Sequence, residues 1–109
     1  MRQYEIWWAD LPAPMGRRPV LLLTRSSAYG YLNKAVVAEI TTTIRGIPQE
    51  VPVGEPEGLV PSVANLDNIH VVAKHLLASR AGVLAPARER EVKRALGYAL
   101  DWAELKVLF

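Results

Sequence analysis

The sequence contains no cysteine, so this chain can form neither a disulfide bond nor a metal site with thiolate ligands. Its two histidines, His70 and His75, are too few to build a structural zinc site by themselves. Long apolar stretches are missing too: the run 19–23 (PVLLL) is far shorter than the ~20 residues that cross a bilayer. The opening MRQYEIWWAD has two acids and lacks the apolar segment of a signal peptide. We therefore expect a soluble cytoplasmic protein that makes no membrane contact.

Motifs of four common enzyme classes are also missing. The chain has no G-x-x-x-x-G-K-[ST] or G-x-G-x-x-G nucleotide-binding loop, no H-E-x-x-H zinc protease motif and no G-x-S-x-G serine hydrolase motif. Glu55 and Glu57 lie two apart in a Pro/Gly loop and could form a pair of catalytic carboxylates, but we expect solvated loop charges. The net charge of +2 is compatible with a polyanionic partner without demonstrating one.

What is present indicates one domain over residues 1–109, since the chain has the length of a single domain and contains no repeat or low-complexity segment. Runs rich in β-branched and aromatic residues predict short strands over 4–11, 19–24, 35–43, 50–53, 62–66 and 69–72. Pro19 suits the first position of its strand, where a missing N–H does least harm. Loops or turns are expected over 12–16, 26–33, 45–48 and 54–58.

The last third of the chain changes to a helical period. Its apolar stripe consists of Val92, Ala95, Leu96, Ala99 and Ala103. Pro86 suits the first turn of this helix, although the preceding Ala85 has no side chain able to cap it. We expect Trp102, at the border of the stripe, to lie in the core or in an interface. The predicted fold class is α+β, mainly β: a strongly curled antiparallel sheet or barrel closed by a C-terminal helix.

Five segments, taken in order, resemble one family. They are EIWWADLP (5–12), RRPVLLLTR (17–25), AEITTT (38–43), SVANLDNIH (62–70) and VLAPAREREVKRAL (83–96). Each segment alone is common, but their order and spacing resemble the MazF/PemK (Kid) family of bacterial toxins over essentially the whole chain. The resemblance implies an SH3-like barrel with appended helices. It also implies a homodimer that cleaves single-stranded RNA at short sequences with no metal or other cofactor, and a cognate antitoxin protein that neutralises it.

The resemblance also assigns catalytic residues. The arginine of the family's R-P-V motif matches Arg18, the hydroxyl residue that ends its A-x-I-T strand matches Thr41, and an aspartate of the Kid branch matches Asp67. Attack of a ribose 2′-OH on the adjacent phosphorus needs a proton acceptor and stabilisation of the phosphoryl charge. Arg18 suits charge stabilisation, Thr41 can donate a hydrogen bond to the phosphate, and Asp67 is the candidate general base.

Five further residues are predicted to contact RNA, namely Arg17, Trp8, Thr42, Asn65 and His70. Trp8 or its neighbour Trp7 should face outward, where it could stack a base or pack in a dimer interface. His70 occupies a position where the family usually has arginine, and we favour a structural role for it over a catalytic one. The segment 12–17 (PAPMGR) is shorter than the matching connection in the family, and Asn65 stands where the Kid branch has a catalytic arginine.

Each of these residues also fits an ordinary structural role. Arg17 and Arg18 could be a solvated turn pair, Thr41 a common strand residue, and Asp67 part of a turn. Two other functions are compatible with an SH3-like barrel. One is a CcdB-like gyrase poison, although the chain ends in KVLF rather than the Trp-Gly-Ile tail of those proteins. The other is a non-catalytic module that binds RNA or protein.

Overall fold

The computed structural model describes residues 1–108, and Phe109, the last residue of the KVLF ending, lies outside the described residues. The strands are β1 (Glu5–Leu11), β2 (Gly16–Leu22), β3 (Lys34–Thr41), β4 (Glu50–Val53), β5 (Ser62–Ala73) and β6 (Leu77–Val83). The helices are α1 (Glu89–Leu100) and α2 (Ala103–Lys106), with short 3₁₀ helices η1 (Ser26–Ala28), η2 (Glu55–Glu57), η3 (Lys74–Leu76) and η4 (Pro86–Arg88). Within residues 1–108 no helix is long and apolar enough to cross a membrane.

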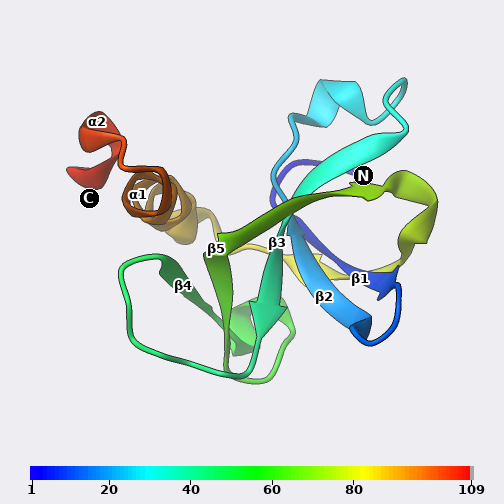
Figure 1. Ribbon diagram of the computed structural model, residues 1–109, viewed down its shortest axis with the longest axis horizontal. Coiled ribbons are helices and arrows are strands. Elements are labelled where there is room, and N and C mark those ends of the chain that lie inside the picture. The colour runs from blue at the N-terminus through cyan, green and yellow to red at the C-terminus, as the bar shows by residue number, and fades with distance from the viewer. Residues whose placement is uncertain (109) are drawn as a thin grey trace.

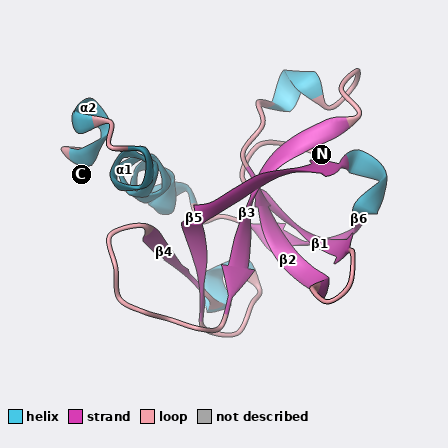
Figure 2. Ribbon diagram, viewed as in Figure 1, coloured by secondary structure: helices cyan, strands magenta, loops and turns pink. Residues whose placement is uncertain are grey.

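The strands form one sheet in the order β4-β5-β3-β2-β1-β6, in which every neighbouring pair is antiparallel. Figure 1 shows that the sheet is strongly curled and that α1 lies at the side of β4 and β5. The colouring of Figure 2 shows that strands make up more of the fold than helices do and that α1 and α2 lie at its periphery. The predicted α+β, mainly β, curled antiparallel barrel with a C-terminal helix is therefore confirmed.

Both faces of the curled sheet are covered, each by its own apolar cluster. Successive residues of a strand point to opposite faces, and β2 shows the consequence: Val20 and Leu22 lie in the cluster inside the curl, whereas Leu21 lies in the cluster beneath α1. Helix α1 contributes Val92 and Ala95 to this second cluster. The uninterrupted apolar run at 19–23, which includes the second half of β2, thus reflects burial on both sides.

Strand β2 begins earlier than predicted. It starts at Gly16 rather than at Pro19, because the β1–β2 hairpin continues through the pair Asp10↔Arg17 to its end at Leu11↔Gly16. Pro19 therefore lies inside the strand, opposite Trp8. The ladder between β2 and β3 begins only at Val20, so the missing N–H of Pro19 interrupts no hydrogen bond to β3.

The predicted strands 62–66 and 69–72 are one continuous strand, β5. Its pairing with β3 jumps from Asn65 to Ile69, so residues 66–68 form a bulge that looks like a break in the sequence. Strand β6 was not predicted at all, because LASRAGV has few β-branched or aromatic residues. It forms by pairing with β1, from Glu5↔Val83 to Ala9↔Leu77.

The predicted helix is present but shorter. Helix α1 ends where Asp101 adopts a left-handed conformation with φ of 57°, so Ala103 belongs to the separate helix α2. Gly97 permits this close return of the chain, since a Cβ there would lie 2.7 Å from the Cβ of Leu105. Trp102 is 48% exposed and is not a core residue, because it lies in the short link between the two helices.

The expectation of a solvated charge is wrong for Glu57 and right for Glu55. The side chain of Glu57 has no exposed surface. It accepts hydrogen bonds from the amides of Gly54 (2.8 Å) and Ala85 (3.0 Å) and from Nε of Arg88 (3.1 Å). Burial by itself raises the pKa of Glu57, but the two amides and the charged Arg88 outweigh it and hold this pKa below its usual value. The carboxylate therefore joins η2 to the start of the helical region.

Glu57→Ala should lower the free energy of unfolding by about 3–5 kcal/mol, because it leaves Arg88 and two amides without their shared partner. The depressed pKa gives the loss a pH dependence: the contribution of Glu57 is present above the usual glutamate value of 4.5 and disappears as the pH falls through the folded-state pKa. Urea denaturation at neutral and acidic pH should therefore show parent and variant converging in acid. Glu55→Ala, at an exposed position of the same turn, is the control and should change stability by less than about 0.5 kcal/mol. Equal stability of the Glu57 variant and the parent at neutral pH would contradict this role.

Candidate functional site

Two hollows adjoin at the ends of β2 and β3. The apolar hollow, of about 390 Å³, is bounded on its apolar side by Trp8, Pro19, Ile40, Leu59 and Val60. The polar hollow, of about 150 Å³, is lined by Arg18, Glu39, Thr41, Thr43, Arg45, Asn65 and Asn68. Arg18 and Thr41 line both hollows. A ligand with an apolar and an anionic part could occupy both at once.

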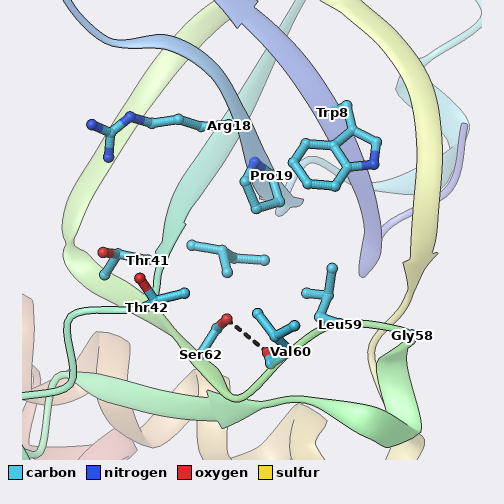
Figure 3. Close-up of a pocket in the computed structure, with 10 residues that line it drawn as sticks. Trp8, Arg18, Pro19, Thr41, Thr42, Gly58, Leu59, Val60 and Ser62 are labelled. Atoms are coloured by element: carbon cyan, nitrogen blue, oxygen red, sulfur yellow. Dashed lines mark hydrogen bonds between the residues drawn. The ribbon is translucent and has the colours of Figure 1, made fainter.

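The sheet register explains why Arg18 and Thr41 share this site. Strands β2 and β3 pair antiparallel up to Val20↔Glu39 and separate beyond that point. Arg18 precedes Val20 by two residues and Thr41 follows Glu39 by two, so alternation places both side chains on the same side of the sheet, just past the last pair. In Figure 3 the guanidinium of Arg18 and the hydroxyl of Thr41 lie on one side of Pro19, and Trp8 lies on the other.

Arg18 is the arginine best placed to bind an anion here. Its Nε donates to the carbonyl oxygen of Met15 at 3.2 Å, and within the described part of the chain it has no ion-pair partner. Arg17 differs, because it donates to both carboxylate oxygens of Asp10, at 2.8 and 3.2 Å. This hydrogen bond, together with the charge of Asp10, raises the pKa of Arg17 further. The predicted RNA contact of Arg17 would therefore have to compete with Asp10.

Two predicted threonines, Thr41 and Thr42, line the hollows, whereas Trp7 does not. Thr41 accepts a hydrogen bond from the amide of Thr43 at 3.1 Å, which leaves its own O–H available as a donor. Thr42 lines the apolar hollow together with Trp8. Trp7, in contrast, packs against the cluster inside the curl.

The residues predicted on β5 separate at the bulge. Asn65 is buried in the polar hollow, and its side-chain oxygen accepts a hydrogen bond from the amide of Asp67 at 2.8 Å. Asp67 itself is exposed and lines neither hollow. His70 does not line the polar hollow but contacts Glu39, which does: its Nε2 lies 3.2 Å from Oε2 of Glu39. The structure thus brings Arg18, Thr41 and Asn65 together and leaves Asp67 outside.

Sequence reasoning missed Glu39, Thr43, Arg45 and Asn68, all of which line the polar hollow. Glu39 carried a signal: it is the only charged residue within the otherwise apolar stretch AVVAEI, and it precedes Thr41 by two positions. Strand alternation therefore puts both residues on one face. Arg45 lies beyond the end of β3 and comes to the site only through the loop. Within residues 1–108, no group of three or more histidine, aspartate or glutamate side chains gathers as a metal site.

Comparison with known proteins gives consistent matches. Residues 2–100 match the family model described as PemK-like, MazF-like toxin of type II toxin-antitoxin system. The probable endoribonuclease MazF5 of Mycobacterium tuberculosis is 41% identical over 99 residues, which cover 89% of this chain and 90% of that protein. Endoribonuclease MazF3 of the same organism is 42% identical over 88 residues, covering 78% of this chain and 85% of that one.

Solved structures with the same fold also match. The Mycobacterium tuberculosis toxin MazF-mt6 superposes with a TM-score of 0.84 at 39% identity, covering 89% of this chain and 96% of that one. A mycobacterial endoribonuclease in complex with its cognate antitoxin also superposes with a TM-score of 0.84, at 28% identity, over 94% and 96% of the two chains. These matches favour the endoribonuclease interpretation over a gyrase poison or a non-catalytic module. The chain belongs to the PemK-like, MazF-like family of toxins of type II toxin–antitoxin systems.

Proposed function

We propose that this chain is an endoribonuclease toxin that cleaves single-stranded RNA at specific short sequences without a metal ion or other cofactor. The observation that carries the proposal is the position of Arg18. Its guanidinium has no ion-pair partner among the described residues and stands where a polar and an apolar hollow adjoin. A nucleotide has this composition, an anionic phosphate joined to a flat base. We propose that residues 1–109 act as one toxin domain.

In the proposed reaction a ribose 2′-OH attacks the adjacent phosphorus and displaces the 5′ oxygen, giving a 2′,3′-cyclic phosphate and a 5′-hydroxyl end. Negative charge accumulates on the phosphoryl oxygens as the 2′ oxygen approaches. Arg18 would stabilise this charge with its fork of N–H donors, and Thr41 would donate its O–H to the same phosphate. Both donors are positioned by the sheet before the RNA binds, so little reorganisation is needed.

RNA selectivity would come from the surrounding residues. Trp8 and Pro19 form an apolar wall on which a base can stack, with Thr42 at the same hollow. Asn65 can hydrogen-bond RNA in the polar hollow, and His70 reaches the site through its contact with Glu39. Arg17 would act at the edge of the site, where it is held by Asp10. Asp67 stays a predicted general base, although its exposed carboxylate lies outside both hollows.

Two protein partners complete the proposal. A cognate antitoxin is supported by the similar mycobacterial endoribonuclease whose structure contains its own antitoxin. A homodimer is supported by a separate apolar hollow of about 550 Å³, lined mainly by Leu23, Val36, Ile69, Leu96 and Leu100. Val36 and Leu100 are 37% and 47% exposed, which is a surface that a second copy could cover. We propose that the protein acts in the cytoplasm, where RNA and antitoxin are both available.

Arg18→Ala should reduce RNA cleavage at least about 10²–10³-fold, since it removes the main stabiliser of the developing phosphoryl charge. The test is incubation of purified protein with a long single-stranded RNA in excess EDTA, followed by mapping of the new 5′ ends. Arg2→Ala, at an exposed arginine outside both hollows, is the matched control and should cut at the parental rate. A folded Arg18 variant that cuts as fast as the parent would refute the role of Arg18. An RNA left intact by the folded parent would refute the proposed function.

Thr41→Val should slow single-turnover cleavage by about 10- to 100-fold, the usual cost of losing a hydrogen bond to a charged group. Valine has nearly the same shape but no hydroxyl, so the apolar packing of β3 is preserved. Thr41→Ser keeps the hydroxyl and should retain most of the rate. If the valine variant keeps the parental rate, or serine is as slow as valine, then the hydroxyl is not used.

A further inference from the structure

Two carboxylates that are shielded from solvent, Glu57 and Glu5, stabilise the fold by accepting hydrogen bonds from backbone amides. Glu57 is held by the amides of Gly54 and Ala85, as described above. Glu5, whose side chain is 13% exposed, accepts hydrogen bonds from the amide of Arg2 and from the indole of Trp7. Each of these carboxylates satisfies backbone donors, and its negative charge is balanced by hydrogen bonds and a nearby arginine. Their burial follows from the needs of the fold.

Glu39 is also partly shielded from solvent, but it satisfies no backbone donor of the described residues. Its side chain is only 19% exposed, yet among residues 1–108 its carboxylate accepts no hydrogen bond. Within the described part of the chain its one contact with a titratable side chain is with Nε2 of His70, at 3.2 Å. The geometry of this contact is not that of a hydrogen bond, so Nε2 of His70 is a buried polar atom with no hydrogen-bond partner among the described residues. Within residues 1–108, Nε2 of His70 is thus held out of water without a hydrogen-bond partner, and the partly shielded carboxylate of Glu39 beside it accepts no hydrogen bond either.

Glu39 lies beside the groups that we propose to bind the phosphate. The side chain lines the polar hollow with Arg18 and Thr41, the two groups proposed to hold the phosphate. A carboxylate that served only to bind RNA would repel that phosphate. A carboxylate that takes a proton beside the phosphate loses its charge in the step in which the phosphoryl oxygens gain theirs. The charged or titratable groups that face it are Arg18 from β2, Arg45 from the loop after β3 and His70 from β5.

We infer that the Glu39 carboxylate is the general base that removes the proton from the attacking 2′-OH, an inference that rests on the proposed function. As the 2′-O–H bond breaks, its proton passes to a carboxylate oxygen of Glu39 and its electron pair forms the bond from the 2′ oxygen to phosphorus. The bond from phosphorus to the 5′ oxygen breaks, and the departing oxygen takes a proton from water. The proton on Glu39 then returns to water, which balances the reaction. Contact with His70 positions the carboxylate toward the hollow.

Two other roles of acidic residues compete with this assignment. Asp67 could still be the base, although its side chain lies outside the polar hollow. Glu39 could instead accept hydrogen bonds from the edge of a base, as carboxylates do with the amino group of cytosine. The two alternatives differ in their consequences: the first predicts that Asp67 controls the rate, and the second predicts that Glu39 controls which sequence is cut.

The test begins with Glu39→Gln, which preserves shape and removes the proton acceptor. Single-turnover cleavage of a single-stranded RNA in EDTA should slow by about 10²–10⁴-fold, the usual contribution of a general base. Affinity for the same RNA with a 2′-O-methyl group at the cut site should stay within about threefold of the parent, and the mapped cut sites should not change. Glu55→Gln is the matched control at an exposed glutamate outside the hollows and should cut at the parental rate.

A second variant separates chemistry from folding. Glu39→Ala leaves room for a small carboxylate, so added formate should restore part of the cleavage rate, whereas chloride at the same ionic strength should not. The proposal is overturned if Glu39→Gln cuts at the parental rate, if its cut sequence shifts, if formate has no effect, or if Asp67→Asn alone abolishes cleavage.

A third experiment distinguishes a general base from a general acid. An RNA with a sulfur in place of the 5′-bridging oxygen has a leaving group that needs no proton, so this RNA should be cut by Glu39→Gln as slowly as the normal RNA. If Glu39→Gln cuts the sulfur-containing RNA at the parental rate, Glu39 is the acid instead. Cleavage by the parent is scored separately, so failure of the proposed function is distinguishable from failure of this assignment.

Discussion

The buried carboxylate of Glu57 is the interaction on which the arrangement of the molecule depends most. It connects the turn after β4 to Ala85 and Arg88, residues that follow about thirty positions later at the entry to α1. The next residues, Gly58 to Val60, form one wall of the apolar hollow. Gly82 in β6 is part of the same junction, since a Cβ there would lie 1.9 Å from the carbonyl oxygen of Glu57. The side chain of Glu57 thus connects the turn after β4 to the entry of α1, and its backbone packs closely against the edge strand β6.

The candidate site forms where two paired strands separate. Beyond Val20↔Glu39 the side chains of β2 and β3 no longer cover one another, and Arg18 and Thr41 are left beside two hollows of opposite character. A rigid sheet holds these groups in place, which favours electrostatic stabilisation without rearrangement. The charge balance is local: Asp10 binds Arg17 and Glu39 contacts His70, whereas Arg18 lines the polar hollow without an ion-pair partner among the described residues.

The parts of the fold that could be predicted are those with strong local patterns. Strand β4 occupies the predicted residues, and β1 and the stripe of α1 are close to the prediction. Strand β6 could not be predicted, because LASRAGV becomes a strand only through its partner β1. The bulge that divides β5 in sequence is likewise defined by the register of β3. In the site, Arg18 and Thr41 stood out through motifs, whereas Arg45 and Asn68 have no local signal.

By itself, the sequence determined the family, the mainly β class and the types of group available for chemistry, because these depend on residue identity and on order along the chain. Only the tertiary structure decided which charges are used by the fold and which are left for a ligand. Glu57 looked solvated and is buried, and Glu39 looked like one polar residue in a strand and lines a hollow together with Arg18. The physical reason is that burial and pairing arise from contacts between strands far apart in sequence, and a local pattern contains no information about those contacts.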